Sequence, residues 1–114
     1  MREGYTLITG ASKGIGLELT KIFAQNHHNL ILVARSKDLL MEIKNDLTKE
    51  YNVKIEVIDA DLTINHIATD IYQKTKELGY RVDYLINNAG FGDYGEFLDS
   101  SMSKNHNMIN INIV

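Results

Sequence analysis

A glycine-rich segment near the N-terminus has the residue types and spacing of an anion-binding turn. It follows an apolar run at residues 5–9 and reads Gly10-Ala11-Ser12-Lys13-Gly14-Ile15-Gly16 before a stretch with helical periodicity. A pyrophosphate at a strand-to-helix turn needs close approach to backbone N–H groups and a helix N-terminus directed at its charge. Gly10 permits the tight turn, Gly14 lets a phosphate approach the backbone, and Gly16 lets helix and strand pack closely. This context favours ligand binding over a glycine turn without a ligand.

The elements that must position this turn alternate between short apolar runs and longer helical stretches. The pattern predicts strands at residues 5–9, 30–34, 53–58 and 82–86. Between them it predicts a helix from Gly14, a helix after the N-cap Ser36 and a helix after Asp61 that Gly79 closes. A last apolar stretch, residues 108–114, is predicted to begin another helix.

The first predicted helix carries its larger apolar residues at helical spacing. Ile15, Leu19, Ile22 and Phe23 recur three, four or seven positions apart and are expected to form its core face. Strands that alternate with such helices predict β-α-β units with right-handed crossovers. We therefore expect an α/β fold, a doubly wound parallel sheet of order 3-2-1-4, in one domain over residues 1–114 that is truncated after the fourth strand.

Composition narrows the functional classes. The 114 residues have a formal charge of -3, no cysteine and no cluster of Lys and Arg, which argues against a disulfide framework, a thiolate metal site and a nucleic-acid surface. No run reaches membrane-spanning length and no signal-peptide pattern opens the chain, so we expect a cytoplasmic protein without a membrane partner. The four histidines lack acidic partners at metal-ligand spacing and are expected at the surface: His27, His28, His66 and His106.

Four motifs in order resemble the short-chain dehydrogenase/reductase family. They are the glycine spacing G-x-x-x-G-x-G, Asp61-Leu62 after the third strand, Asn87-Asn88-Ala89-Gly90 at the end of the fourth, and Asn112 near the C-terminus. The resemblance covers essentially the whole chain. It implies a Rossmann-like fold and hydride transfer between a nicotinamide cofactor and a small-molecule carbonyl or alcohol.

The end of the second strand predicts which nicotinamide dinucleotide is bound. A carboxylate there holds the ribose diol of NAD, whereas Arg or Lys attracts the 2'-phosphate of NADP. This chain has Ala34-Arg35-Ser36 at that point, and Lys13 matches a second basic position of NADP-preferring members. Both side chains could simply be solvated surface charges. Their joint placement favours NADP(H), with NADPH bound more tightly than NADH.

The resemblance also implies a role for individual residues. Asp61 should contact the adenine, Leu62 should line the adenine pocket, and residues 88–90 should pass beside the adenosine ribose; Asn88 could equally tie neighbouring strands together. Asn112 looks like the catalytic Asn that holds a water in the proton relay. The full set of expected cofactor residues is Gly10, Ser12, Lys13, Gly14, Ile15, Gly16, Arg35, Asp61, Leu62, Asn88, Ala89 and Gly90.

The rest of the family's catalytic apparatus has no match here. Family enzymes use a Tyr whose pKa a Lys one helical turn away lowers, together with a Ser that orients the substrate oxygen. The one Tyr-x-x-x-Lys pattern, Tyr72 and Lys76, falls in the third helix, remote from the expected nicotinamide position, and is interpreted as a partly exposed helix face. We therefore expect the 114-residue chain alone to be inactive.

Ending after a fourth strand would leave residues 84–86 on an open apolar sheet edge, which invites pairing with another chain. This predicts a homo-oligomer.

Three other functions remain as alternatives. A non-catalytic module that binds dinucleotide, or only a partner, would bind NADPH without turnover. A doubly wound methyltransferase would carry an acid at the end of the second strand, where this chain has Arg35. A nucleotide-sugar epimerase would space its glycines as G-x-x-G-x-x-G, which the segment 10–16 does not.

Overall fold

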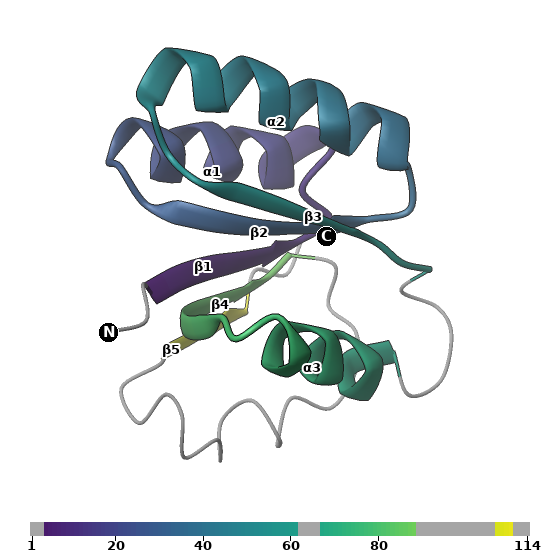
Figure 1. Ribbon diagram of the computed structural model, residues 1–114. Coiled ribbons are helices and arrows are strands. Elements are labelled where there is room, and N and C mark those ends of the chain that lie inside the picture. Colours follow the sequence, from purple (N-terminus) through teal and green to yellow (C-terminus); the bar gives the residue numbers. More distant parts are fainter. Residues whose placement is uncertain (1–3, 62–66, 89–106, 111–114) are drawn as a thin grey trace.

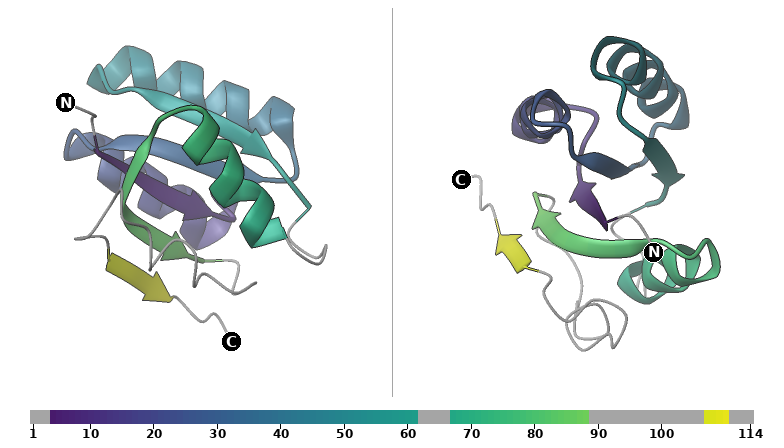
Figure 2. Two further views of the ribbon diagram at one scale, coloured as in Figure 1. Left: turned by 60° about the horizontal axis from the view of Figure 1, so that its bottom comes forward. Right: turned by 60° about the vertical axis from the view of Figure 1, so that its left-hand side comes forward.

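The structure is a computed structural model that describes residues 4–61, 67–88 and 107–110. Within these ranges five strands form one parallel sheet in the order β3-β2-β1-β4-β5. Helices α1 and α2 cover one face of this sheet and α3 covers the other (Figures 1 and 2). The elements in chain order are β1 (Gly4–Thr9), α1 (Gly14–Gln25), β2 (Asn29–Ala34), α2 (Lys37–Tyr51), β3 (Ile55–Asp59), α3 (Ile67–Glu77), β4 (Arg81–Asn87) and β5 (Asn107–Asn110).

The doubly wound α/β architecture and the strand order 3-2-1-4 are confirmed. The core lies in two layers, one on each side of the sheet. Along β1 and β2, successive residues alternate between the layers, with Ile8 and Leu32 toward α1 and α2 and Leu7 and Ile31 toward the α3 side. Both strands are buried from their second residue to their last because both faces of the sheet are covered.

The beginning and end of α2 follow its sequence signals. The Ser36 side chain accepts a hydrogen bond from the Leu39 backbone N–H at 3.4 Å, as the predicted N-cap. Asn52 ends the helix in the left-handed conformation, with φ 55°, which an Asn side chain tolerates.

Residues 107–110 correct two predictions. They form β5, a strand and not the start of a helix, and β5 pairs in parallel with β4, with Tyr84 opposite Asn107 and Asn87 opposite Asn110. The sheet is therefore not truncated after the fourth strand, and the expected open edge at residues 84–86 is paired. The physical reason is that unpaired strand N–H and C=O groups are costly, and β5 pairs those along the edge of β4.

The predicted core face of α1 is wrong in part. Its buried residues are the small ones, Gly16, Thr20 and Ala24, whereas Ile15 and Ile22 are 46% and 50% exposed. These small residues, four positions apart, let the helix lie close to the sheet, so the larger side chains are displaced to its flanks. The Thr20 hydroxyl is satisfied within the helix, since it donates to the Gly16 carbonyl at 2.7 Å.

A tyrosine pair lies at the amino end of the sheet, where the turn after α3 leads into β4. The Tyr80 ring lies 4.6 Å from that of Tyr5, centroid to centroid. Burial, reinforced by a hydrogen bond and charge from Glu56, raises the pKa of Tyr80 from 10.0 to about 12. The folded chain therefore holds the phenol proton more tightly than the unfolded chain does. The stability that this difference gives is fully present only at pH values below the pKa of the unfolded chain.

This pKa predicts a loss of stability at alkaline pH. Between pH 10.0 and about 12 the folded chain holds a proton that the unfolded chain has released, so raising the pH favours unfolding. We expect Tyr80→Phe to flatten the fall in the free energy of unfolding across this window, measured by urea denaturation at a series of pH values. Tyr51→Phe is the matched control. An equally steep fall in Tyr80→Phe would contradict the assignment.

Candidate functional site

The glycine turn is attached to the carboxyl end of β2. The backbone N–H groups of Gly10 and Ala11 both donate to the Val33 carbonyl, at 2.8 and 3.3 Å. Gly10 has φ 64°, in the left-handed region that favours glycine, and this lets the chain turn sharply out of β1. The turn therefore lies where the carboxyl ends of the two central strands meet.

Gly16 is the point of closest approach between α1 and the turn. A Cβ atom at Gly16 would lie 1.9 Å from the Gly10 carbonyl oxygen and 2.7 Å from Nδ2 of Asn88. That amide in turn donates to the same Gly10 carbonyl at 3.3 Å. Only a residue without a side chain fits this position, which is the close helix–strand packing that the glycine spacing predicts.

The N-terminus of α1 has the properties of an anion site. Gly14 has φ 55°, and a Cβ atom added there would meet nothing within 4 Å, so the space beside this backbone is open. Lys13, the N-cap residue, makes no side-chain capping bond, and within the described chain the first turn of α1 carries no acidic residue. Uncapped N–H groups and the positive end of the helix dipole thus meet open space beside an exposed lysine.

The end of β2 supplies the second basic position. Arg35 follows directly after the last residue of β2 and is exposed, as is Lys13. The neighbouring strand end is fixed in place because the Ala60 N–H donates to the Ala34 carbonyl at 2.9 Å. Asp61, which follows Ala60, is half-buried.

Hydrogen bonds connect the end of β4 to the glycine turn and to the end of β1. The bond from Thr9 was not predicted from the sequence. The buried Thr9 hydroxyl lies 3.3 Å from Oδ1 of Asn87 and 3.4 Å from the Ile86 carbonyl, to either of which it can donate. The signal in the sequence is a hydroxyl residue directly before the glycine turn and a strand that ends in paired asparagines. These bonds hold the carboxyl ends of β1 and β4 together.

One polar atom beside the turn is unsatisfied. Among the described residues, Oδ1 of Asn88 is buried and has no hydrogen-bond partner, although its Nδ2 is bound to Gly10. Buried polar atoms are normally paired, so an orphaned acceptor is typical of a position that a ligand completes. A pyrophosphate-containing dinucleotide fits this cradle: close backbone approach, a free helix N-terminus, two basic side chains and one spare acceptor.

The structure brings together most but not all of the expected site. Gly10, Ser12, Lys13, Gly14, Ile15 and Gly16 belong to one turn, and Ile15 is exposed there rather than in the core. Leu62, Ala89, Gly90 and Asn112 lie outside the described residues, as do His66 and His106. Within the described ranges no group of three or more His, Cys, Asp or Glu side chains could hold a metal ion, and no helix is long and apolar enough to cross a membrane.

The Tyr-x-x-x-Lys pattern lies away from the glycine turn. Tyr72 is half-buried against the core layer on the α3 side, and Lys76 is exposed, with Nζ 5.9 Å from the centroid of the Tyr72 ring. Lys76 stands near the C-terminus of α3, just before the turn into β4 and hence toward the amino end of the sheet. The interpretation as a partly exposed helix face is confirmed.

Comparison with known proteins agrees with this geometry. Residues 5–114 match the family model described as short chain dehydrogenase. Over 119 aligned residues the chain is 30% identical to the very-long-chain 3-oxoacyl-CoA reductase of Rattus norvegicus, covering 96% of this chain and 36% of that reductase.

Two solved structures show the same fold. The bulky-bulky ketone specific alcohol dehydrogenase from Comamonas testosteroni is 38% identical, with a TM-score of 0.67 over 88% of this chain and 40% of that one. A short-chain dehydrogenase from Sphingobium yanoikuyae in complex with NADPH is 37% identical, with a TM-score of 0.67 over 89% of this chain and 39% of that one. The chain thus spans little more than a third of the length of these proteins. Because the family model matches residues 5–114, the chain belongs to the short-chain dehydrogenase family of oxidoreductases.

Proposed function

We propose that this chain binds NADP(H) and forms the dinucleotide half of an oxidoreductase. The observation that carries the proposal is the close approach of Gly16 to the Gly10 carbonyl, which only glycine at position 16 permits. This approach lies at the N-terminus of α1, which has no side-chain cap. The bound nicotinamide would supply hydride transfer to or from a carbonyl or alcohol. Support for this chemistry comes from the relatives, which are named as reductases and dehydrogenases of such compounds.

Each residue of the expected site has a role in this proposal. The backbone N–H groups at the start of α1 donate to the pyrophosphate, and the open space at Gly14 admits it. Arg35 and Lys13 attract the 2'-phosphate, and Asp61 contacts the adenine. The free Oδ1 of Asn88 accepts a hydrogen bond from the adenosine ribose. Leu62, Ala89 and Gly90 complete the adenosine site, and Asn112 serves the proton relay.

Among the residues that the structure describes, the glycine turn has no Tyr–Lys pair beside it. Their one Tyr-x-x-x-Lys pattern lies in α3, away from the glycine turn. We therefore propose that a polypeptide of these residues binds the cofactor without oxidising it in the presence of carbonyl compounds. A catalytic Tyr, Lys and Ser would have to come from residues other than these.

A non-catalytic dinucleotide-binding module is the second candidate function. It is supported by the same glycine turn, because no Tyr–Lys pair lies beside this turn in the part of the chain that the structure describes. The two are distinguished in the whole protein: an oxidoreductase oxidises NADPH when a panel of ketones and aldehydes is added, and a binding module does not.

The binding proposal predicts a preference between the reduced cofactors. Arg35 and Lys13 are cations that gain charge-assisted hydrogen bonds only with the 2'-phosphate, so NADPH is expected to bind about tenfold or more tightly than NADH. Titration of the chain with each cofactor, followed by the fluorescence of the reduced nicotinamide, measures this ratio. The preference should weaken at high salt, since exposed charges are screened. Equal affinities at low salt would refute the NADP assignment.

A further inference from the structure

The outer strand β3 presents unused backbone groups along its whole length. β3 pairs with β2 on one side, and the described structure places no strand on its other side. The Leu30 N–H donates to the Lys54 carbonyl at 2.9 Å, so in this parallel ladder the even-numbered residues of β3 turn their backbone groups toward β2. The N–H and C=O groups of Ile55, Val57 and Asp59 therefore point outward.

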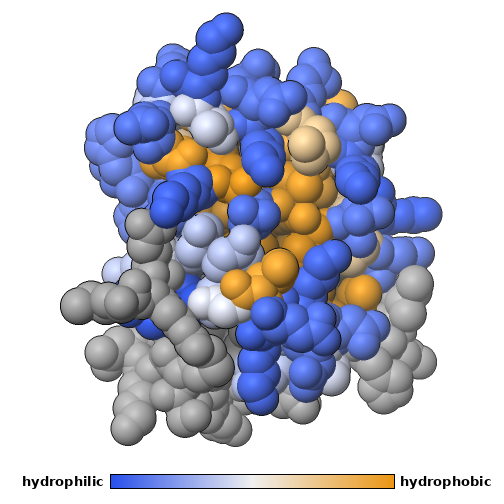
Figure 3. All heavy atoms as spheres, viewed as in Figure 1, coloured by the Kyte–Doolittle hydropathy of each residue, from blue (hydrophilic) through white to orange (hydrophobic). Residues whose placement is uncertain are grey.

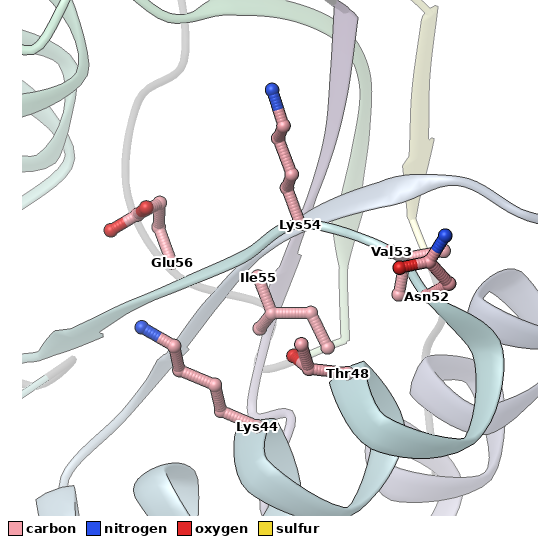
Figure 4. Close-up of a pocket in the computed structure, with 7 residues that line it drawn as sticks. All are labelled: Lys44, Thr48, Asn52, Val53, Lys54, Ile55 and Glu56. Atoms are coloured by element: carbon pink, nitrogen blue, oxygen red, sulfur yellow. The ribbon is translucent and has the colours of Figure 1, made fainter.

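Two side chains of opposite charge lie along this edge without a partner. Asp59, the last residue of β3, is exposed. Lys44 reaches from α2 toward the other end of β3, where it lines a hollow of about 470 Å³ together with Thr48 and Ile55 (Figure 4). Within the ranges that the structure describes, neither Asp59 nor Lys44 takes part in an ion pair. The edge thus carries an unpaired acid at one end and an unpaired base toward the other.

A second copy of the chain can pair with this edge in one register that uses the whole strand. With an antiparallel arrangement and a two-fold axis through Val57, Ile55 lies opposite Asp59 of the other copy, and Glu56 lies opposite Ile58. All five residues of β3 then face the five residues of the second β3. The outward residues form the hydrogen-bonded pairs of this ladder, and each such pair exchanges both its N–H···O=C bonds.

The side chains on the α2 side of the sheet match in this register, because opposite residues of an antiparallel pair project to the same face. Apolar residues gather on the face of the molecule where β3 lies foremost (Figures 1 and 3), and the half-buried Val57 would meet Val57 of the second copy there. Asp59 of the second copy would stand beside Ile55 at the hollow, where Lys44 can reach its carboxylate. The two-fold axis repeats this contact at the other end of the strand.

The elements around β3 leave room for a second sheet. α2 packs above the β2–β3 pair through Leu40 and Leu47 (Figure 2). Because neighbouring strands are about 4.8 Å apart, the two α2 helices would lie about 10 Å apart across the axis, an ordinary helix–helix distance. On the other face, the Glu56 carboxylate accepts a hydrogen bond from Tyr80, whose ring packs against Tyr5 of β1. This carboxylate is therefore drawn toward the interior of the sheet and away from the second copy.

We propose that two copies of this chain associate through antiparallel pairing of their β3 strands about Val57, with Asp59 of each copy bound to Lys44 of the other. An extended peptide would need an acidic side chain for Lys44 and a basic one for Asp59 at the correct spacing. A second copy supplies both by symmetry, and the two-fold axis closes the assembly at a dimer. The contact runs along the outer edge of the sheet and leaves the glycine turn between β1 and α1 open.

Charge exchange tests this interface directly. Sedimentation velocity of the chain, from micromolar to submillimolar concentration, is expected to show a monomer–dimer equilibrium. Asp59→Lys and Lys44→Asp should each weaken the dimer about tenfold or more, because two attractive pairs become repulsive. The double variant Lys44→Asp/Asp59→Lys should restore it. Lys49→Asp, with the same charge change at an exposed position of α2, is the control and should leave the dimer unchanged.

Val57→Pro provides a test without a change of charge. The Val57 N–H faces outward, so proline removes a donor to the second copy but none to β2, and the fold should be retained in circular dichroism. The dimer should be lost in this variant. A strict monomer of the unchanged chain at all concentrations overturns the proposal. So does a dimer that ignores both single charge reversals, or a folded double variant that stays monomeric.

Discussion

Gly16→Ala is expected to destabilise the fold by about 3 kcal/mol and to abolish cofactor binding. The new Cβ atom would lie 1.9 Å from the Gly10 carbonyl oxygen and 2.8 Å from its carbonyl carbon. Backbone atoms cannot move aside as a flexible side chain can, so α1 must shift away from the turn. That shift would displace the N–H groups that face the pyrophosphate and break the bond between Asn88 and Gly10. Urea denaturation and an NADPH titration measure the two effects.

Gly14→Ala is the matched control for this substitution. A Cβ atom at Gly14 meets nothing within 4 Å, and the cost comes only from its left-handed φ of 55°, about 1–2 kcal/mol. The stability of Gly14→Ala should therefore exceed that of Gly16→Ala, whereas NADPH binding should weaken in both. If the two variants unfold at the same urea concentration, the close approach at Gly16 does not govern the stability of the turn.

Arg35→Asp is expected to reverse the cofactor preference. It removes a cation from the expected 2'-phosphate position and provides a carboxylate that can accept hydrogen bonds from a ribose diol. NADPH affinity should fall about 100-fold, and NADH affinity should stay the same or rise. Arg35 is exposed at the end of β2, so the substitution should leave the fold intact.

Lys49→Asp is the control for the change in net charge. Lys49 lies in the last turn of α2, toward the amino end of the sheet and far along the helix from Arg35. It should leave the ratio of NADPH to NADH affinity unchanged. A ratio that shifts equally in both variants would show that overall charge, and not a contact at Arg35, sets the preference.

The strands and their order could be predicted because β1 and β2 carry mainly apolar runs between well-marked turns. The N-cap Ser36 and the turn glycines were equally informative, since a helix start and a left-handed turn restrict which residues can stand there. The glycine spacing also predicted the close contact at Gly16. These features share one property: the residue type itself restricts the local backbone.

The face of α1 could not be predicted in the same way. Apolar periodicity favoured Ile15 and Ile22, but the helix packs through Gly16, Thr20 and Ala24. How closely a helix approaches a sheet decides whether large or small side chains are buried, and this distance is a property of the tertiary packing. The glycine at position 16 was the one clue that α1 approaches closely.

The strand β5 was predicted as the start of a helix, although its sequence pattern indicates a strand. From Ile109 to Ile113 isoleucine and asparagine alternate, a period of two that is typical of a strand. The resemblance to a family helix position favoured a helix at this point instead. In the structure, residues 107–110 pair with β4, whose edge offers backbone hydrogen bonds to an extended segment. The contact between Thr9 and Asn87 also escaped prediction, because it joins residues 78 positions apart.

We propose that the carboxyl end of the sheet, at the glycine turn, binds NADP(H). The most direct test is to record amide NMR spectra of the isotope-labelled chain while NADPH is added. If NADPH binds at the glycine turn, the largest shifts occur at Gly10, Gly14, Gly16 and Arg35. The signals of Lys44, Thr48 and Lys54, which line a hollow between α2 and the start of β3, then stay unchanged. Shifts confined to that hollow, or no shift at the turn under saturating NADPH, would contradict it.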